Sequence, residues 1–207
     1  MPAKNSVKLF LENGFYHVYN RGTGRGEIFL DHEDYKVFLH YLEKYLDPAD
    51  EESLSKKVKL LAYCLMPNHF HLFVQQFSKD GLTVFMRSVS TSYAMYFNKK
   101  YSRSGTLFQG IYKAALVESE PYFLHLSRYI HLNPAGLIDD WQAYKYSSYK
   151  AYVGKDKISW LDPTAVLDFF KTNRQTGGAF SGHFSYESFV KDHAGDSKEM
   201  LGELTID

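Results

Sequence analysis

The side chains best suited to chemistry in this sequence are two histidines and, later in the chain, a tyrosine and an asparagine. Residues 66–74 read MPNHFHLFV, in which one apolar residue separates His69 from His71. Residues 126–134 read LSRYIHLNP, in which Tyr129 and Asn133 are four positions apart. Imidazole nitrogens and amide oxygens bind divalent cations, and an activated phenol is a nucleophile. The four residues together could therefore attack an electrophile beside a bound metal ion.

The two histidines fit a metal site if their segment is a β-strand. Residues i and i+2 of a strand point to the same face, so His69 and His71 would project side by side, about 6.6 Å apart along the strand. Two such imidazoles can bind one divalent metal ion. Histidines that are merely hydrogen-bonded at the edge of a core would give the same pattern. The pair is therefore weak evidence for a metal when taken alone.

Tyr129 and Asn133 would share one face of a helix, with Cβ atoms about 5–6 Å apart. Their ordinary roles would be packing for the tyrosine and a helix C-cap for the asparagine that precedes Pro134. Read with the histidines, Asn133 offers a neutral oxygen to complete a metal site, and Tyr129 places a phenol beside it. A metal that polarises a phosphoryl oxygen would help an un-ionised phenol to react. Tyrosine attack on a phosphodiester is then chemically coherent.

The elements that must position these residues can be read from hydrophobic periodicity. Apolar and aromatic patterns predict seven segments in the order β-α-β-β-α-β-α, at residues 15–20, 31–46, 58–65, 69–75, 82–101, 111–117 and 121–133. This order predicts an α+β fold, a ferredoxin-like antiparallel sheet with helices packed on it. Residues 10–150 would form the domain. Residues 151–207 would be a C-terminal extension, and the chain reads as irregular from Trp141 onward.

Composition bounds the setting in which the protein works. The length of 207 residues fits one domain with an appendage. Cys64 is the only cysteine, which excludes an internal disulfide and favours a reducing compartment. No apolar run approaches the roughly 18 residues of a membrane span, and the first residues lack the apolar region of a signal peptide. We therefore expect a soluble, cytoplasmic protein with no membrane partner.

The charge distribution favours a nucleic-acid partner, although 24 basic and 24 acidic side chains cancel. Residues 81–117 contain no Asp or Glu, and their basic residues are interleaved with Tyr and Phe. Basic groups neutralise phosphates and aromatic faces stack on unpaired bases. An amphipathic helix with a solvated face would explain part of this pattern. The candidate DNA contacts are His17, Arg21, Arg25, Arg87, Lys99, Lys100, Arg103 and Lys113.

Several motifs in this order resemble the HUH single-tyrosine transposases. They are Tyr16-His17-Val18 with Arg21-Gly22, residues 62–72 (AYCLMPNHFHL), residues 96–98 (YFN), residues 105–110 (GTLFQG) and residues 128–134 (RYIHLNP). The sequence is most similar to the REP-associated tyrosine transposase branch of that family. The resemblance covers about residues 10 to 150.

The resemblance implies a fold, a metal and a reaction. The family's histidine pair corresponds to His69 and His71, its nucleophile to Tyr129, and its third metal ligand to Asn133. The implied cofactor is Mg²⁺ or Mn²⁺, and the implied partner is single-stranded DNA with a neighbouring hairpin. Tyrosine attack would leave a free 3′-OH and a 5′-phosphotyrosine bond, and rejoining would reverse that step. Members of the family act as a monomer or a homodimer.

The sequence departs from the family at two places, and both departures remove positive charge near the expected DNA path. Pro134 runs directly into Ala135-Gly136, where a basic residue is common. Ile111 follows Gly110, where an arginine is often found, and Lys113 is then the nearest cation.

Two other functions remain compatible with the sequence. The first is a non-catalytic or host-recruited protein that binds single-stranded or hairpin DNA on the same fold. The second is a metal-dependent hydrolase that uses water in place of the tyrosine. The hydrolase is the least favoured, because the sequence offers no Asp or Glu near the histidines to act as a base.

Overall fold

A computed structural model describes residues 10–118, 120–176 and 185–192 of the chain. Its core elements follow the predicted order, and their ends lie within a few residues of the expected positions. They are β1 (Phe15–Arg21), α1 (His32–Leu46), β2 (Val58–Met66), β3 (His69–Gln76), α2 (Gly81–Lys100), β4 (Lys113–Leu116) and α3 (Glu120–Leu132). The largest difference is in β4, which is shorter than predicted because Ile111 and Tyr112 are not paired with β1. The exposed Ile111 lies at the end of a bend that leads into β4.

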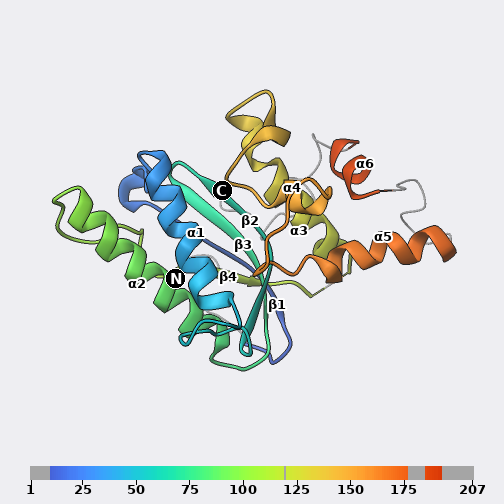
Figure 1. The fold of residues 1–207 in the computed structure, drawn as a ribbon, viewed down its shortest axis with the longest axis horizontal. Coiled ribbons are helices and arrows are strands. Elements are labelled where there is room, and N and C mark those ends of the chain that lie inside the picture. Colours follow the sequence, from blue (N-terminus) through green and yellow to red (C-terminus); the bar gives the residue numbers. More distant parts are fainter. Residues whose placement is uncertain (1–9, 119, 177–184, 193–207) are drawn as a thin grey trace, which may run out of the picture.

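The four strands form one antiparallel sheet in the order β2-β3-β1-β4. This order, with helices after β1 and β3, is the ferredoxin-like arrangement that the sequence predicts. Figure 1 shows α1 and α2 on one side of the sheet and α3 on the other. Of the later helices, α5 contacts β2 and α3, and α6 contacts α3. The sheet is therefore covered on both faces.

Strand β3 is the centre of the core because it pairs on both edges and is buried on both faces. Phe70 packs against Phe38 of α1, with ring centroids 5.2 Å apart. Phe73, on the other face, packs against Phe123 of α3 at 4.9 Å. Alternation along the strand places His69 and His71 on the α3 side. Phe70 points to the opposite face, toward α1.

The ends of α1 and α2 are joined by a buried carboxylate. Asp31 caps α1 by accepting a hydrogen bond from the backbone N–H of Asp34, and Asp34 itself is fully buried. Lys100 at the end of α2 donates to Asp31 and to Asp34, each at 2.8 Å. The hydroxyl of Tyr101 also donates to Asp34 at 2.8 Å. These bonds compensate the burial of the Asp34 charge and fix the two helices relative to each other.

The C-terminal part differs from the irregular extension that the sequence predicts. It contains α4 (Tyr149–Tyr152), α5 (Thr164–Thr176) and α6 (Tyr186–Lys191), which follow two short 3-10 helices, η2 (Asn133–Gly136) and η3 (Trp141–Ala143). Val166, Phe189 and Val190 are fully buried. These apolar side chains explain why the segment folds onto β2 and α3. Residues 177–184 and 193–207 of the expected extension lie outside the described residues.

Helix α6 packs on the outer face of α3, where buried polar contacts join the two helices. The hydroxyl of Tyr186 is hydrogen-bonded to His131 Nδ1 at 2.6 Å and to Ser127 Oγ at 3.1 Å. Burial lowers the pKa of His131 to about 3, so its imidazole is neutral at neutral pH. Arg128 donates to the carbonyl of Phe189 at 3.3 Å and lies 4.5 Å from the centroid of its ring. Because α3 carries Tyr129, these contacts also hold the tyrosine in place.

Among the described residues, none of the helices combines the length and the apolar character needed to cross a lipid bilayer.

Replacing Tyr186 by phenylalanine tests the attachment of α6 to α3. The variant leaves a buried nitrogen of His131 without its partner, so we expect the free energy of unfolding to fall by about 1–3 kcal/mol. Urea unfolding followed by circular dichroism would measure the change. Tyr122→Phe is the matched control, because the Tyr122 side chain is 43% exposed; its effect should stay within about 0.5 kcal/mol. Equal effects of the two substitutions would contradict the role assigned to Tyr186.

Candidate active site

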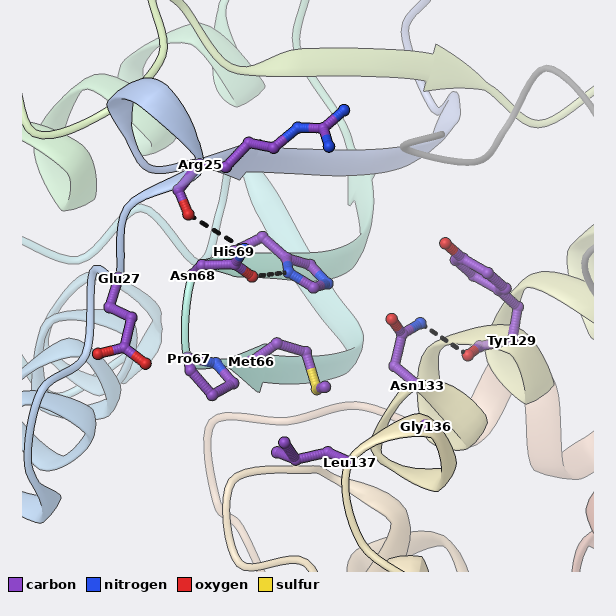
Figure 2. Close-up of a pocket in the computed structure, with 10 residues that line it drawn as sticks. All are labelled: Arg25, Glu27, Met66, Pro67, Asn68, His69, Tyr129, Asn133, Gly136 and Leu137. Carbon is purple, nitrogen blue, oxygen red and sulfur yellow. Dashed lines mark hydrogen bonds between the residues drawn. The ribbon is translucent and has the colours of Figure 1, made fainter.

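The predicted site residues come together at one end of the sheet, on the α3 side. His69, Tyr129 and Asn133 line an open pocket of about 530 Å³. Figure 2 shows His69 on one wall, with Asn133 and Tyr129 on the facing helix. His71 lies beneath the pocket and is fully buried, and its ring centroid is 5.3 Å from that of Tyr129. The histidine pair and the tyrosine–asparagine pair are therefore parts of one site.

Asn133 has both its ordinary role and an orientation that suits a metal ligand. Its amide nitrogen donates to the backbone carbonyl of Tyr129 at 3.0 Å, which caps the end of α3. With the amide assigned from that bond, the amide oxygen turns away from the helix, toward the side of the pocket that holds His69 (Figure 2). The two roles expected for Asn133, a helix C-cap and a metal ligand, are therefore compatible.

His71 is a neutral base with one uncommitted nitrogen. Burial and the neighbouring His69 and His17 hold its pKa well below the usual value, although a contact with Asn133 raises it slightly. Its Nδ1 atom is 2.9 Å from His17 Nε2, whereas its Nε2 atom is buried and has no hydrogen-bond partner among the described residues. A neutral imidazole with a lone pair available is the form that binds metals.

The donor set fits a divalent metal ion only if the third ligand is the amide. No group of three His, Cys, Asp or Glu side chains in the described part of the chain is arranged to hold a metal. His69, His71 and the Asn133 oxygen supply two nitrogens and one oxygen instead. The unpartnered Nε2 atom of His71 is the observation that favours a ligand here, because a buried polar atom is rarely left unsatisfied.

Three loops meet beside the pocket and fix its rim. The backbone N–H of Gly22 donates to the carbonyl of Asn68 at 2.9 Å, that of Thr23 to Leu107 at 2.9 Å, and that of Gln109 to Arg21 at 2.8 Å. The loop after β1 is thus tied to the β2–β3 turn and to the segment that precedes β4. A Cβ atom on Gly22 would lie 2.0 Å from the carbonyl oxygen of Gly26. Only glycine fits at that position.

The structure separates the expected DNA contacts into groups. Arg21 and Lys113 lie opposite His69 and Tyr19 in the strand register, so they share the face of the site, and Arg25 lines the pocket. Four of the others lie elsewhere, and His17 lies within the site. Arg87 and Lys99 are exposed on α2 across the sheet, Lys100 is paired with Asp31 and Asp34, and Arg103 lies 5.4 Å from the Phe97 ring centroid. His17 is fully buried against His71.

The burial of His17 corrects the expectation that it contacts DNA, because a side chain with no exposed surface cannot reach a phosphate. Nothing in the local sequence indicates this burial, since it depends on the pairing of β1 with β3. Sequence reasoning also missed Asn68, whose Oδ1 atom is 2.6 Å from His69 Nδ1. Its place directly before the histidine motif, in a two-residue turn, is a signal that could have identified it.

A carboxylate lies in the pocket, contrary to the expectation that none is near the histidines. Glu27 lines the same pocket as His69, and Figure 2 shows it on the wall next to Pro67. It lies far from the histidines in the sequence, and the loop between β1 and α1 brings it back. The sequence argument against a base in this site is therefore wrong.

Comparisons with known proteins agree with the geometry. Residues 15–133 match the model of the family described as IS200-like transposase. A solved structure of a REP-associated tyrosine transposase bound to a REP hairpin is similar in fold, with a TM-score of 0.57 and 13% identity over 75% of this chain and 95% of that chain. A proposed transposase from Deinococcus radiodurans R1 matches with a TM-score of 0.40 and 17% identity, over 63% of this chain and 95% of that chain. The search of curated proteins found no match.

A Gly22→Ala substitution tests whether the three-loop junction is as tight as it looks. The added methyl group must displace the Gly26 carbonyl, so we expect a loss of about 1–3 kcal/mol in the free energy of unfolding. Thermal or urea unfolding would measure it. Gly136→Ala is the control, because a Cβ atom there meets no atom within 4 Å. A Gly22→Ala protein as stable as this control would show that the junction adapts.

Proposed function

The chain belongs to the IS200-like transposase family, and from this premise we propose that it cuts and rejoins single-stranded DNA through Tyr129. The observation that carries the proposal is the convergence of Tyr129, Asn133 and His69 on one pocket, above a His71 nitrogen without a partner. The phenol can supply the nucleophile for phosphoryl transfer, and the amide oxygen and two imidazoles can hold a metal ion that activates the phosphate.

The residues that would hold a divalent metal ion are His69, His71 and Asn133, with Mg²⁺ or Mn²⁺ as the cofactor. The ion would withdraw charge from a non-bridging oxygen of the scissile phosphate and so make the phosphorus more electrophilic. The chain contributes the positions of these three ligands, which strand β3 and the end of α3 hold on opposite sides of the pocket. Tyr129 lies one helical turn before Asn133, so the nucleophile lines the same pocket as two of the ligands.

Tyr129 would supply the attacking atom. Its phenol oxygen forms a bond to phosphorus while the bond from phosphorus to the 3′ oxygen breaks. The phenol loses its proton and the departing 3′ oxygen gains one, so the products are a free 3′-OH and a 5′-phosphotyrosine. Rejoining is the reverse reaction with another 3′-OH. The energy of the phosphodiester is kept in the tyrosine bond, so no external energy source is needed.

The DNA path would cross the open pocket at the end of the sheet, on the side that carries the site. Arg21, Arg25 and Lys113 supply positive charge on this side, where they can neutralise phosphates. We propose a hairpin beside the single-stranded segment, by analogy with the hairpin-bound relative of similar fold. The exposed Ile111 lies where many relatives carry an arginine, so this chain would depend more heavily on Lys113. A protein that acts on such a substrate would work in the cytoplasm.

Glu27 favours a second candidate function, cleavage by water. A carboxylate in the pocket could act as a general base, and a water molecule would then take the place of the tyrosine. That reaction leaves no bond between protein and DNA. The two candidates therefore differ in one product, the covalent adduct.

Replacing Tyr129 by phenylalanine decides between the two. We expect the wild-type protein, with Mn²⁺ and an oligonucleotide carrying a hairpin, to form an adduct that migrates slowly in a denaturing gel. Tyr129→Phe removes the attacking oxygen and should abolish both adduct and cleavage. Tyr122→Phe, on the exposed start of α3, is the control and should react like the wild type. Cleavage that survives Tyr129→Phe would instead support the water reaction.

The metal assignment is tested by removing one ligand at a time. His69→Ala and Asn133→Ala each delete a ligand without emptying the core, because both side chains are only partly buried. We expect each variant to bind Mn²⁺ about 10-fold or more weakly, as measured by the electron paramagnetic resonance signal of free Mn²⁺. Exposed His40, on α1, provides the control His40→Ala. Unchanged Mn²⁺ affinity in both site variants would contradict the ligand set.

A further inference from the structure

Both histidines of the pair have their Nδ1 atom engaged by a neighbouring side chain. His69 Nδ1 lies 2.6 Å from Asn68 Oδ1, and His71 Nδ1 lies 2.9 Å from His17 Nε2. The two contacts come from different elements, the β2–β3 turn and strand β1. The two contacts are nevertheless equivalent, because each engages Nδ1, the ring nitrogen nearer the backbone. In each ring, Nε2 is the nitrogen that these contacts do not engage.

Asn68 determines which nitrogen of His69 carries the proton. Its amide nitrogen donates to the carbonyl of Arg25 at 3.3 Å, so its amide oxygen is the atom that faces His69 (Figure 2). An amide oxygen only accepts hydrogen bonds. His69 Nδ1 must therefore donate, and in the neutral ring the proton is on Nδ1. The lone pair of His69 is then on Nε2.

The contact between His17 and His71 joins two imidazoles, so one must donate and the other accept. If His17 donated, the proton of the neutral His71 would be on Nε2, a buried atom that no described residue meets in hydrogen-bond geometry, although Asn133 is near enough to raise the pKa of the ring. Buried N–H groups without an acceptor are rarer than buried acceptors without a donor. The favoured arrangement therefore has His71 donating from Nδ1 to His17. Its Nε2 atom then carries a lone pair.

We propose that His17 and Asn68 are positioning residues that hold His71 and His69 in the Nδ1–H form and so present both Nε2 lone pairs to one divalent cation. Neither residue touches DNA in this role. Partners of this kind fix the orientation of metal-binding imidazoles and raise their affinity for the metal. The link to strand transfer rests on the proposed function, whereas the protonation of the two rings does not.

Packing around His17 supports a fixed orientation. Its ring stacks on that of His71, with centroids 5.1 Å apart and an angle of 19° between the planes. The Tyr129 ring lies edge-to-face with both imidazoles, with its centroid 5.8 Å from that of His17 and 5.3 Å from that of His71. Three aromatic rings from β1, β3 and α3 thus restrain one another. A rotation of His71 that exchanged its nitrogens would have to disturb all three.

The first test reads the protonation directly in the metal-free wild-type protein. Two-bond ¹H–¹⁵N correlation spectra distinguish the two neutral forms of each imidazole, and at neutral pH we expect the Nδ1–H form for both His69 and His71. An Nε2–H form for His71 would overturn the assignment of His17. An Nε2–H form for His69 would overturn the role assigned to Asn68. No variant has to fold for this measurement to be decisive.

The second test measures Mn²⁺ affinity without DNA. His17→Leu removes the acceptor for His71, whereas His17→Gln places an amide oxygen where the ring nitrogen was. We expect about a 10- to 100-fold loss of affinity for the first variant and near wild-type affinity for the second. Asn68→Leu and Asn68→Asp form the matching pair for His69. Wild-type affinity in folded His17→Leu and Asn68→Leu proteins would overturn the proposal.

These measurements distinguish a failure of the positioning roles of His17 and Asn68 from a failure of strand transfer by Tyr129. If the wild-type protein formed no adduct with DNA, strand transfer by Tyr129 would fail, yet the ring protonation and the ranking of Mn²⁺ affinities would stand. If the adduct formed normally but His71 carried its proton on Nε2, the positioning role of His17 would fail alone. A paired result, with the expected protonation and the expected affinity loss, supports both residues.

Discussion

The pairing of β1 with β3 is the constraint on which the rest of the structure depends. This register places His17 diagonally beside His71 and puts Arg21 directly opposite His69. A shift of one residue would turn the whole set of β1 side chains to the other face. The buried His17–His71 contact, the arginine at the rim and the loop that returns Glu27 to the pocket all follow from this one alignment. Phe70, on the opposite face, helps to enforce it by packing against α1.

The nucleophile is supported from the side of the sheet that faces away from α1 and α2. Helix α3 packs on β2 and β3, and its own outer face is covered by α6 through Tyr186 and the Arg128–Phe189 contact. Burying a guanidinium and an imidazole is costly unless both are hydrogen-bonded, so α6 can dock in few ways. The result is a helix with little freedom to rotate. Tyr129 and Asn133 therefore keep their common face toward the pocket.

The sequence was sufficient to predict the core of the fold, because strand alternation and helical periodicity are strong between residues 15 and 133. It was not sufficient after Trp141. Helix α6 begins with a capping box in which Ser188 takes the place of the usual Glu or Gln, so the common start signal is absent. The apolar residues of α5 bury against elements far away in the chain, and that burial is visible only once the sheet is built.

The candidate site was predictable to a similar extent. His69, His71, Tyr129 and Asn133 lie in short motifs whose geometry follows from local structure, and the structure brings them together as expected. Their roles as ligands and nucleophile remain predictions. His17 and Glu27 could not be placed, because one depends on the register between two strands and the other on the path of a loop. Residues that act through another residue leave no spacing pattern in the sequence.

The fastening of α3 by α6 also determines when the protein becomes complete during its synthesis. Chains fold from the N-terminus as they leave the ribosome. The sheet, with both histidines and their neighbours, can assemble once the residues up to 116 have emerged. The helix that carries Tyr129 gains its outer support only when residues 186–191 have followed. A ribosome that stalls between these points would hold a chain with both histidines in place, but with Tyr129 and Asn133 still loosely held.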